Sequence, residues 1–387
     1  METSELLELI ARGEDSSLEF KADVTNEKSL AQELVAFANS SGGILLIGVG
    51  DDGTLTGLNS DDIPRINRIL VNASSGNIRP AINVETKNVL LEKGIVVVVS
   101  VPRGVSKPYV DSDGVVWVRS GASKRKTTSR EELQRLFQAS GLIHGDGIEV
   151  PGMTVADLDL PYFQEFYKKE YGQSLDSVEV PLPQLLENMN LMKDGNFNRS
   201  GALLFSREPT AKLPLFMIKA VAYPGTDISV EHYIESKDII GKIIDQYQQI
   251  SNFIRRNIRY IQREKGINTV GDPEIPGIVF EELLVNAIIH RDYFVAAPIR
   301  VFIFADRIEI ISPGHLPNNL TVANILQGNS NIRNPILASF ATKILPYRGL
   351  GSGIRRSLQA YPHIEFIDER DGNFFKATIK RLPVVSN

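Results

Sequence analysis

The chain has 387 residues, of which 42% are hydrophobic and 23% charged, a composition typical of a globular protein with more than one domain. It contains no cysteine, which excludes disulfides and thiolate metal sites, and its formal net charge of −5 excludes a generally basic nucleic-acid coat. The N-terminus lacks the features of a signal peptide, and the longest apolar run, IVVVVSV at 95–101, is too short to cross a bilayer. We therefore expect a cytoplasmic protein with no membrane contact, in which any nucleic-acid site is a local patch.

The first 140 residues are predicted to form one mixed α/β unit. Apolar positions at 27–40 have helical spacing, a hairpin is expected to turn at 92–94, and 114–121 has the pattern of a strand. Residues 48–53 match the dinucleotide fingerprint GxGxxG in form. However, the fingerprint requires a helix to begin there, and the strand-like TLTGL follows instead. We interpret this segment as a hairpin turn.

A glycine-rich stretch at 141–152 without periodicity predicts a domain boundary. Beyond it, helical and strand-like segments alternate, with SGALLF (200–205) interpreted as a strand. An amphipathic helix follows at 237–262, and its broad apolar stripe predicts either core packing or an oligomer interface. The expected fold is a multi-domain α/β chain. Its predicted parts are an N-terminal domain at 1–140, a connecting segment at 141–270 and a C-terminal domain at 271–387.

The C-terminal part carries a candidate site for phosphate and metal. Glu282 and Asn286 are four residues apart on a predicted helix, so the carboxylate and the carboxamide share one face. A carboxylate there can orient a water towards a γ-phosphate, and an amide oxygen can ligate Mg²⁺. Gly349, Gly351 and Gly353 precede another helix, where backbone N–H groups can approach phosphate oxygens. Each signal is weak alone, and their order along the chain carries the prediction.

That order resembles the GHKL nucleotide-binding fold, an α/β sandwich. More closely, EELLVNAIIHRDY, ADRIEIISPGHLP, NIRNPILA and GLGSGI resemble the C-terminal domain of RecG-helicase-related transcriptional regulators, over about residues 275–385. The resemblance implies that Glu282 is the base of a weak ATPase, that Asn286 binds Mg²⁺ and that Gly314 lies near adenine. It places Gly349, Gly351 and Gly353 at the phosphates of ATP or a related nucleotide.

Ser312 departs from the pattern of the wider GHKL fold. That fold carries an aspartate before the loop glycine, and the aspartate reads the adenine amino group, whereas this sequence has Ser312 and Pro313. ATP binding and hydrolysis therefore both stay open at this stage. No GxxxxGK[ST] motif occurs in the sequence, so we expect no helicase motor.

A second resemblance covers about residues 10–138. LEFKADV, AQELVAFANSSGG, ILLIGVGDDG and WVRSGASKRKTTSREEL resemble, in that order, the Schlafen AlbA-type domain. The resemblance implies nucleic-acid binding, with DNA favoured over RNA. Phosphate oxygens attract cations and hydroxyl donors, which the chain offers after the last predicted strand. The candidate contacts are Arg119, Ser123, Lys124, Arg125, Lys126 and Arg130. The alternative is a solvated charged loop.

The same family raises the possibility of a nuclease. RNA-cleaving Schlafen proteins carry two glutamates five residues apart and a later aspartate as a metal-dependent site. Glu14 and Glu19 have that spacing, Lys21 follows, and Asp51 and Asp52 end the ILLIGVG strand. Converging carboxylates could hold divalent cations for phosphodiester hydrolysis. The simpler alternative is that Glu19 pairs with Lys21 while the aspartates form the turn.

Three functions are compatible with these patterns. The leading one is a transcriptional regulator that binds nucleic acid through its N-terminal domain and is controlled by a nucleotide, with Mg²⁺, in its C-terminal domain. The second is a metal-dependent nuclease that acts on RNA or DNA. The third is a non-catalytic scaffold that assembles as a homo-oligomer.

Overall fold

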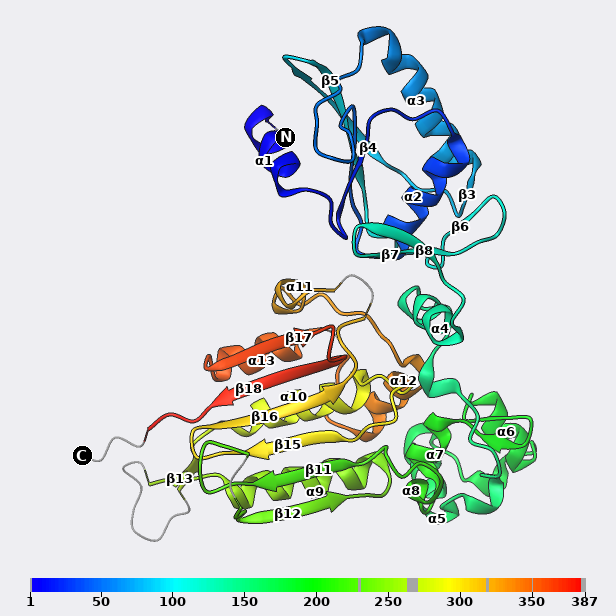
Figure 1. Ribbon diagram of the computed structural model, residues 1–387. Helices are drawn as coiled ribbons and strands as arrows, with labels where there is room; N and C mark the ends of the chain where they lie inside the picture. The colour runs from blue at the N-terminus through cyan, green and yellow to red at the C-terminus, as the bar shows by residue number, and fades with distance from the viewer. Residues whose placement is uncertain (1, 229–230, 263–270, 318–319, 350, 384–387) are drawn as a thin grey trace. The chain divides into compact units, whose positions relative to one another are not determined.

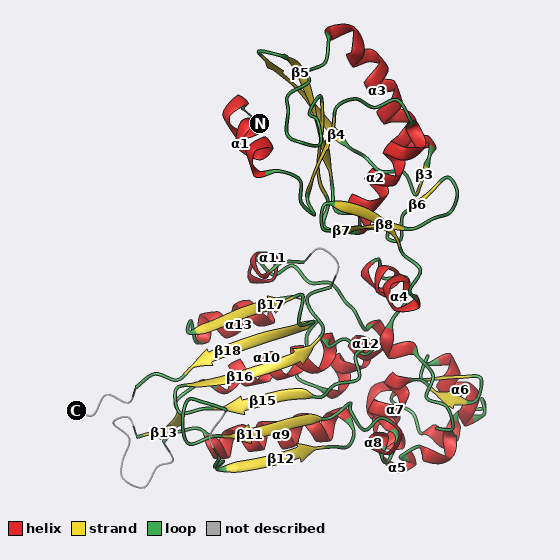
Figure 2. Cartoon of the chain, in the orientation of Figure 1, coloured by secondary structure: helices red, strands yellow, loops and turns green. Residues whose placement is uncertain are grey.

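The computed structural model describes residues 2–228, 231–262, 271–317, 320–349 and 351–383. It divides the chain into two compact units, Met1–Ile143 and His144–Asn387, and both mix helices with strands (Figures 1 and 2). The predicted multi-domain α/β class is confirmed. None of the described helices combines the length and the apolar character that a membrane crossing requires.

The N-terminal unit is built on a four-stranded sheet. Its helices are α1 (Thr3–Arg12), α2 (Glu27–Asn39), α3 (Ile63–Val71) and α4 (Arg130–Ala139). Its strands are β1 (Leu18–Lys21), β2 (Gly43–Ile47), β3 (Ile78–Arg79), β4 (Glu85–Leu91), β5 (Gly94–Val101), β6 (Val110–Asp111), β7 (Trp117–Ser120) and β8 (Ser123–Lys126). The sheet order is β1-β2-β5-β4, and β7 and β8 form a separate hairpin. β1 runs parallel to β2, and the other neighbours in the sheet are antiparallel.

The central strands of this sheet are apolar on both faces because both faces are covered. Successive side chains of a strand point to opposite faces. Leu45 and Val97 therefore enter a core with α2 and α3, whereas Leu46 and Val96 enter a second core with Leu6 of α1. Figure 1 shows α2 and α3 on one side of the strands and α1 on the other. This two-sided burial explains the continuous apolar run at 95–101.

Residues 48–53 form a turn, as the sequence predicts. The Gly50 N–H donates to the Thr54 carbonyl at 2.8 Å, and the Gly53 N–H donates to the Gly50 carbonyl at 2.8 Å. The next helical turn begins only at Ser60. The dinucleotide-binding interpretation of this GxGxxG match is therefore excluded.

The C-terminal unit contains one six-stranded sheet of order β12-β11-β15-β16-β18-β17. The strands of this sheet are β11 (Ile218–Ala222), β12 (Glu235–Ile239), β15 (Ile299–Ile303), β16 (Arg307–Pro313), β17 (Ile364–Glu369) and β18 (Phe374–Lys380). Two short pairs lie outside it. One joins β9 (Met192–Lys193) to β10 (Asn196–Phe197), and the other joins β13 (Tyr260–Ile261) to β14 (Asp272–Pro273). β11 and β15 are parallel, and the other neighbours are antiparallel.

Nine described helices accompany this sheet. They are α5 (Leu160–Tyr171), α6 (Leu182–Asn188), α7 (Arg199–Phe205), α8 (Pro209–Lys212), α9 (Ile243–Asn257), α10 (Gly277–His290), α11 (Val322–Leu326), α12 (Pro335–Ile344) and α13 (Gly353–Ala360). In Figures 1 and 2, α9, α10 and α13 cover one face of the sheet. One helical layer on one sheet face is the arrangement of an α/β sandwich.

Two element predictions in this unit are wrong. SGALLF forms the helix α7, because the Asn198 side chain accepts from Gly201 N at 2.8 Å and so caps a helix. A short apolar run does not by itself distinguish a buried strand from a buried helix. The helix predicted at 237–262 begins at Ile243, because Gly241 with φ of 105° ends the edge strand β12 just before it.

The apolar stripe of α9 packs inside the chain. Ile243, Ile250 and Phe253 belong to one core that extends through the whole C-terminal unit. β11 and β12, from the segment predicted as a connection, lie in the same sheet as the strands beyond residue 271. The structure therefore has one unit where the sequence suggests a boundary near 270, since sheet pairing between distant segments leaves no mark on local sequence.

Candidate functional site

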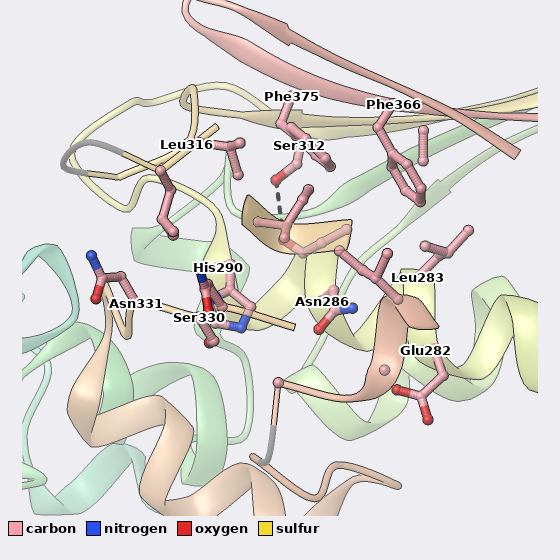
Figure 3. Close-up of a pocket in the computed structure, with 18 of the residues that line it drawn as sticks. Glu282, Leu283, Asn286, His290, Ser312, Leu316, Ser330, Asn331, Phe366 and Phe375 are labelled. Carbon is pink, nitrogen blue, oxygen red and sulfur yellow. Dashed lines mark hydrogen bonds between the residues drawn. The ribbon is translucent and has the colours of Figure 1, made fainter. Parts of the chain in front are cut away.

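A pocket in the C-terminal unit lies between the helix α10, the strands β16, β17 and β18, and the start of α13 (Figure 3). Its empty space is about 1030 Å³, including the part open to solvent. Every residue predicted for nucleotide or Mg²⁺ binding lines it: Glu282, Asn286, Ser312, Gly314, Gly349, Gly351 and Gly353. The fold thus brings together three segments that are far apart in the sequence.

The helix α10 presents three polar side chains to the pocket at four-residue spacing, namely Glu282, Asn286 and His290. Sequence patterns alone did not place His290 in the pocket, although its spacing from Asn286 repeats that of Asn286 from Glu282. Burial, assisted by the charge of Arg333, lowers the pKa of His290 to about 4. The imidazole is therefore neutral at neutral pH, and its Nε2 lies 3.4 Å from the Tyr347 hydroxyl.

Glu282 is buried and ion-paired. Only 8% of the residue is exposed, and its Oε1 pairs with the Nη2 of Arg356 on α13. Burial raises the pKa of Glu282, against the opposing effect of the Arg356 charge. A Cβ at Gly353 would lie 2.3 Å from the Glu282 Oε2, so the carboxylate abuts the start of α13. This close approach explains why a residue without a side chain stands at position 353.

Ser312 is buried at the end of β16, and its hydroxyl donates to the Ala287 carbonyl at 3.1 Å. Ala287 lies in the last turn of α10, whose carbonyls have no partner within the helix. Because the hydroxyl proton is used there, the oxygen can act only as an acceptor towards the pocket. In this respect Ser312 resembles the aspartate that it replaces.

The sheet side of the pocket is apolar. Phe366 of β17 and Phe375 of β18 line it, with ring centroids 5.9 Å apart and planes 18° from parallel. Figure 3 shows both rings on this side together with Leu316, while Glu282 and Asn286 lie on the helical side. The pocket therefore has an apolar half and a polar half. Such a division suits a ligand with a flat ring at one end and charge at the other.

The glycine-rich segment closes the polar half. Gly349 and Gly351 both have φ of 67°, a conformation that favours glycine, and Leu350 between them lies outside the described residues. α13 begins directly afterwards at Gly353. Two cations, Arg348 and Arg356, also line this half of the pocket. The start of a helix, the glycines before it and the two guanidinium groups together form a place that suits an anion.

The N-terminal unit places the predicted basic loop on the β7–β8 hairpin, with one correction. The Arg119 side chain is only 1% exposed, and its Nη1 pairs with Glu19 at 2.9 Å and with Glu33 at 3.3 Å. Lys124 pairs with Glu33 at 2.7 Å. Arg119 thus does not face solvent as a phosphate contact would. Strand register explains why Arg119 and Lys124 both reach Glu33, because the two are partners across the hairpin and share one face.

Four other predicted contacts, Ser123, Arg125, Lys126 and Arg130, are exposed. Arg125 forms an ion pair with Glu132 of α4. The Lys126 Nζ lies 5.4 Å from the centroid of the Trp117 ring, a cation–π arrangement. The accessible positive charge of the hairpin is therefore smaller than the sequence suggests.

Three of the four carboxylates proposed for a nuclease are engaged within the protein, and the fourth, Asp51, is exposed. Glu14 accepts from the Phe20 N–H at 2.7 Å, and Glu19 is held by Lys21 and Arg119. Asp52 accepts from the Thr54 N–H at 2.9 Å within its own turn. In the part of the chain that the structure describes, no three His, Asp or Glu side chains are grouped to hold a metal ion.

Lys21 is part of the same network. Burial opposes its charge, but the hydrogen bond to Glu19 and the charges of Glu19, Glu33 and Asp51 outweigh this effect and raise the pKa of Lys21. These contacts favour the simpler interpretation, in which Glu19 and Lys21 form an ion pair and Asp52 shapes the turn.

The structure shows a two-part α/β chain with a pocket in its second part. Residues 14–128 match the family model of the Schlafen AlbA_2 domain, and residues 296–379 match the one described as "Putative ATP-dependent DNA helicase recG C-terminal". The two matches fall on the families that the sequence motifs resemble. The second match begins after α10, so Glu282 and Asn286 lie outside it.

Two solved structures are similar to the chain. One is the crystal structure of the DIP2311 protein from Corynebacterium diphtheriae, with a TM-score of 0.48 and 21% identity over 99% of this chain and 80% of that chain. The other is the solution NMR structure described as the "N-terminal Domain of Putative ATP-dependent DNA Helicase RecG-related Protein" from Nitrosomonas europaea. It has a TM-score of 0.25 and 23% identity over 33% of this chain and 91% of that chain. The curated proteins gave no match.

Proposed function

We propose that this protein is a nucleic-acid-binding transcriptional regulator whose C-terminal pocket binds an ATP-type nucleotide. The observation that carries the proposal is the division of the pocket into an apolar half with one acceptor, Ser312, and a polar half with the glycine-rich segment. A nucleotide is divided in the same way, into a flat base and charged phosphates. The match of residues 296–379 to the family model described as "Putative ATP-dependent DNA helicase recG C-terminal" supports the same ligand class.

In this proposal the base lies on the sheet side of the pocket. Phe366, Phe375 and Leu316 supply the apolar surface there. An exocyclic amino group of the base donates to the Ser312 hydroxyl, whose own proton is used on Ala287. The phosphates then reach the N-terminus of α13, where backbone N–H groups and the positive end of the helix dipole favour anions.

Asn286 is the residue that fits Mg²⁺. Its side chain lines the pocket, and its Nδ2 lies 3.5 Å from where a Cβ at Gly353 would stand, so the carboxamide is beside the proposed phosphate loop. Mg²⁺ is usually bound by one or two protein oxygens together with substrate phosphates and water. The ion would supply positive charge that neutralises the phosphates.

Equilibrium binding tests the nucleotide half of the proposal. We expect the full chain to bind ATP more tightly with Mg²⁺ than without it, and we expect Asn286→Ala to lose this Mg²⁺ dependence. Asn188→Ala on α6, an exposed residue outside the pocket, is the control and should bind as the wild type does. Absence of binding to ATP, ADP and GTP at millimolar concentrations would reject the proposal.

Mobility shifts with labelled DNA and RNA test the other half. We expect binding at low salt, weakened by Lys126→Ala and by Arg130→Ala but not by Lys93→Ala, an exposed lysine elsewhere in the N-terminal unit. If the protein is a regulator controlled by a nucleotide, ATP must also change the mobility shift.

The same probes test the other two functions. Cleavage of either probe in Mg²⁺ or Mn²⁺ that is lost in Glu19→Gln would support the nuclease. Sedimentation of the same samples would detect a homo-oligomeric scaffold.

A further inference from the structure

We propose that Arg356 discriminates nucleoside triphosphates from diphosphates by exchanging Glu282 for the terminal phosphate. The inference rests on the proposed nucleotide function and assigns a role within that pocket to a residue that neither sequence motif includes. In the structure Arg356 Nη2 holds Glu282 Oε1. A terminal phosphate in the same half of the pocket competes with Glu282 for this guanidinium.

Arg356 is placed for such a competition. It lies in the first turn of α13, where its N–H donates to the Ser352 carbonyl at 3.0 Å, and it lines the pocket. Its side chain is 28% exposed, so a ligand can reach it. Its Nε is buried without a hydrogen-bond partner among the described residues, so the guanidinium has donor capacity beyond Glu282.

The exchange would also change the ability of Glu282 to accept a proton. Its Oε2 is confined against Gly353, and the residue is 8% exposed, so the carboxylate cannot move out to solvent without rearranging the start of α13. A carboxylate held by a guanidinium is a poor proton acceptor. When a phosphate takes Arg356, Glu282 becomes free to accept a proton from water, which is the role of a general base.

Because Glu282 and the terminal phosphate compete for Arg356, each substitution has a predictable effect on ATP affinity. A terminal phosphate carries more negative charge than a carboxylate and offers paired oxygens to a guanidinium, so it can win Arg356. Replacing Glu282 by glutamine removes the competitor and should tighten ATP binding. Replacing Arg356 by alanine removes the cation and leaves Glu282 repelling the phosphate, so ATP binding should weaken. ADP, which lacks the terminal phosphate, should respond little to either change.

The experiment measures dissociation constants of Mg-ATP and Mg-ADP for the full chain at fixed ionic strength. We expect Arg356→Ala to weaken ATP binding by about tenfold, the value of one strong charge-assisted hydrogen bond, and to leave ADP binding within about twofold. Glu282→Gln should tighten ATP binding alone. Arg356→Lys keeps the charge and should restore part of the ATP preference.

Arg355→Ala is the matched control. Arg355 is the exposed neighbour on α13, it is outside the pocket lining, and its Cδ lies 3.5 Å from where a Cβ at Gly328 would stand. Its removal should change neither affinity. A melting curve of each variant shows whether it is folded, and Arg356→Lys and Glu282→Gln carry the test if Arg356→Ala is not.

Two results overturn the inference while the proposed function stands: equal weakening of ATP and ADP in Arg356→Ala, or weaker ATP binding in Glu282→Gln. Either would mean that the ion pair only supports the fold. If the wild-type chain binds neither nucleotide, the proposed function fails first and the inference falls with it. The wild-type titration therefore separates the two failures.

Discussion

Gly353 and Glu282 are 71 positions apart in the sequence and are neighbours in the pocket. A Cβ at 353 would lie 2.3 Å from the Glu282 carboxylate and 3.5 Å from Asn286 Nδ2. The glycine is thus required for room and not for an unusual backbone angle, since only Gly349 and Gly351 of this segment have positive φ.

Gly353→Ala should therefore damage the pocket. We expect it to cost about 1–3 kcal/mol of unfolding free energy through overpacking and to weaken nucleotide binding. The control is Gly277→Ala at the start of α10, where a Cβ would meet nothing within 4 Å. It should be neutral or stabilise by up to about 1 kcal/mol. Urea unfolding of both variants decides this, and equal stabilities would contradict the packing argument.

His290 should make stability depend on pH. Burial lowers its pKa from 6.5 to about 4, so between these values the unfolded chain binds a proton that the folded chain does not. Stability from this group is therefore lost as pH falls from about 6.5 to about 4, by up to about 3 kcal/mol. His290→Gln should flatten the wild-type curve in that window, whereas the exposed His363→Gln should not. Superimposable curves for wild type and His290→Gln would exclude the effect.

At the scale of elements, α10 is held at its C-terminal end by side chains from three other segments. Ser312 donates to the Ala287 carbonyl at 3.1 Å, Tyr293 to Ile288 at 3.0 Å and Asn334 to Ile289 at 2.8 Å. These carbonyls have no partner within the helix. The helix that presents Glu282, Asn286 and His290 is thereby fixed against β16 and α12.

Of these three side chains, Asn334 offers the clearest test of how the end of α10 is held. It is fully buried, and its amide donates to both Ile289 and Arg291 carbonyls at 2.8 Å. Asn334→Ala leaves both acceptors unsatisfied and should cost about 2–4 kcal/mol. Asn331→Ala, in the same loop but exposed, should change stability by less than about 0.5 kcal/mol. Denaturant unfolding compares them, and a small loss in Asn334→Ala would show that α10 does not depend on this cap.

At the scale of the whole molecule, a net charge of −5 confines the proposed nucleic-acid binding to a small patch. The burial of Arg119 and the pairing of Lys124 leave Arg125, Lys126 and Arg130 as the exposed cations of the hairpin region, and Arg125 is itself exposed while paired with Glu132. We therefore expect only a few cations to contact nucleic-acid phosphates.

The dependence of DNA affinity on salt measures that interface. Three phosphate contacts predict a slope of about −2.7 in log affinity against log salt, or about a 40-fold loss between 50 and 200 mM. Lys126→Ala should reduce the slope by about one, and Lys93→Ala should not. A much steeper slope would mean that cations outside the hairpin bind the nucleic acid.

Local patterns in the sequence were sufficient for several features of this protein. The turn at 48–53, the helix that carries Glu282 and Asn286, and the two family resemblances all depend on neighbouring residues, spacing and motif order. Spacing along a helix determines which side chains share a face, so the pairing of Glu282 with Asn286 could be predicted without knowing what lies opposite.

Only the tertiary structure decided which groups face each other across the fold. The ion pair between Glu282 and Arg356, the burial of Arg119 against Glu19 and Glu33, and the use of the Ser312 proton on Ala287 all join distant segments. SGALLF forms the helix α7, which is buried on all sides, so its apolar run has no pattern that distinguishes a helix from a strand. The free energy of a charge or a hydroxyl depends on its burial and its partners, and long-range packing sets both.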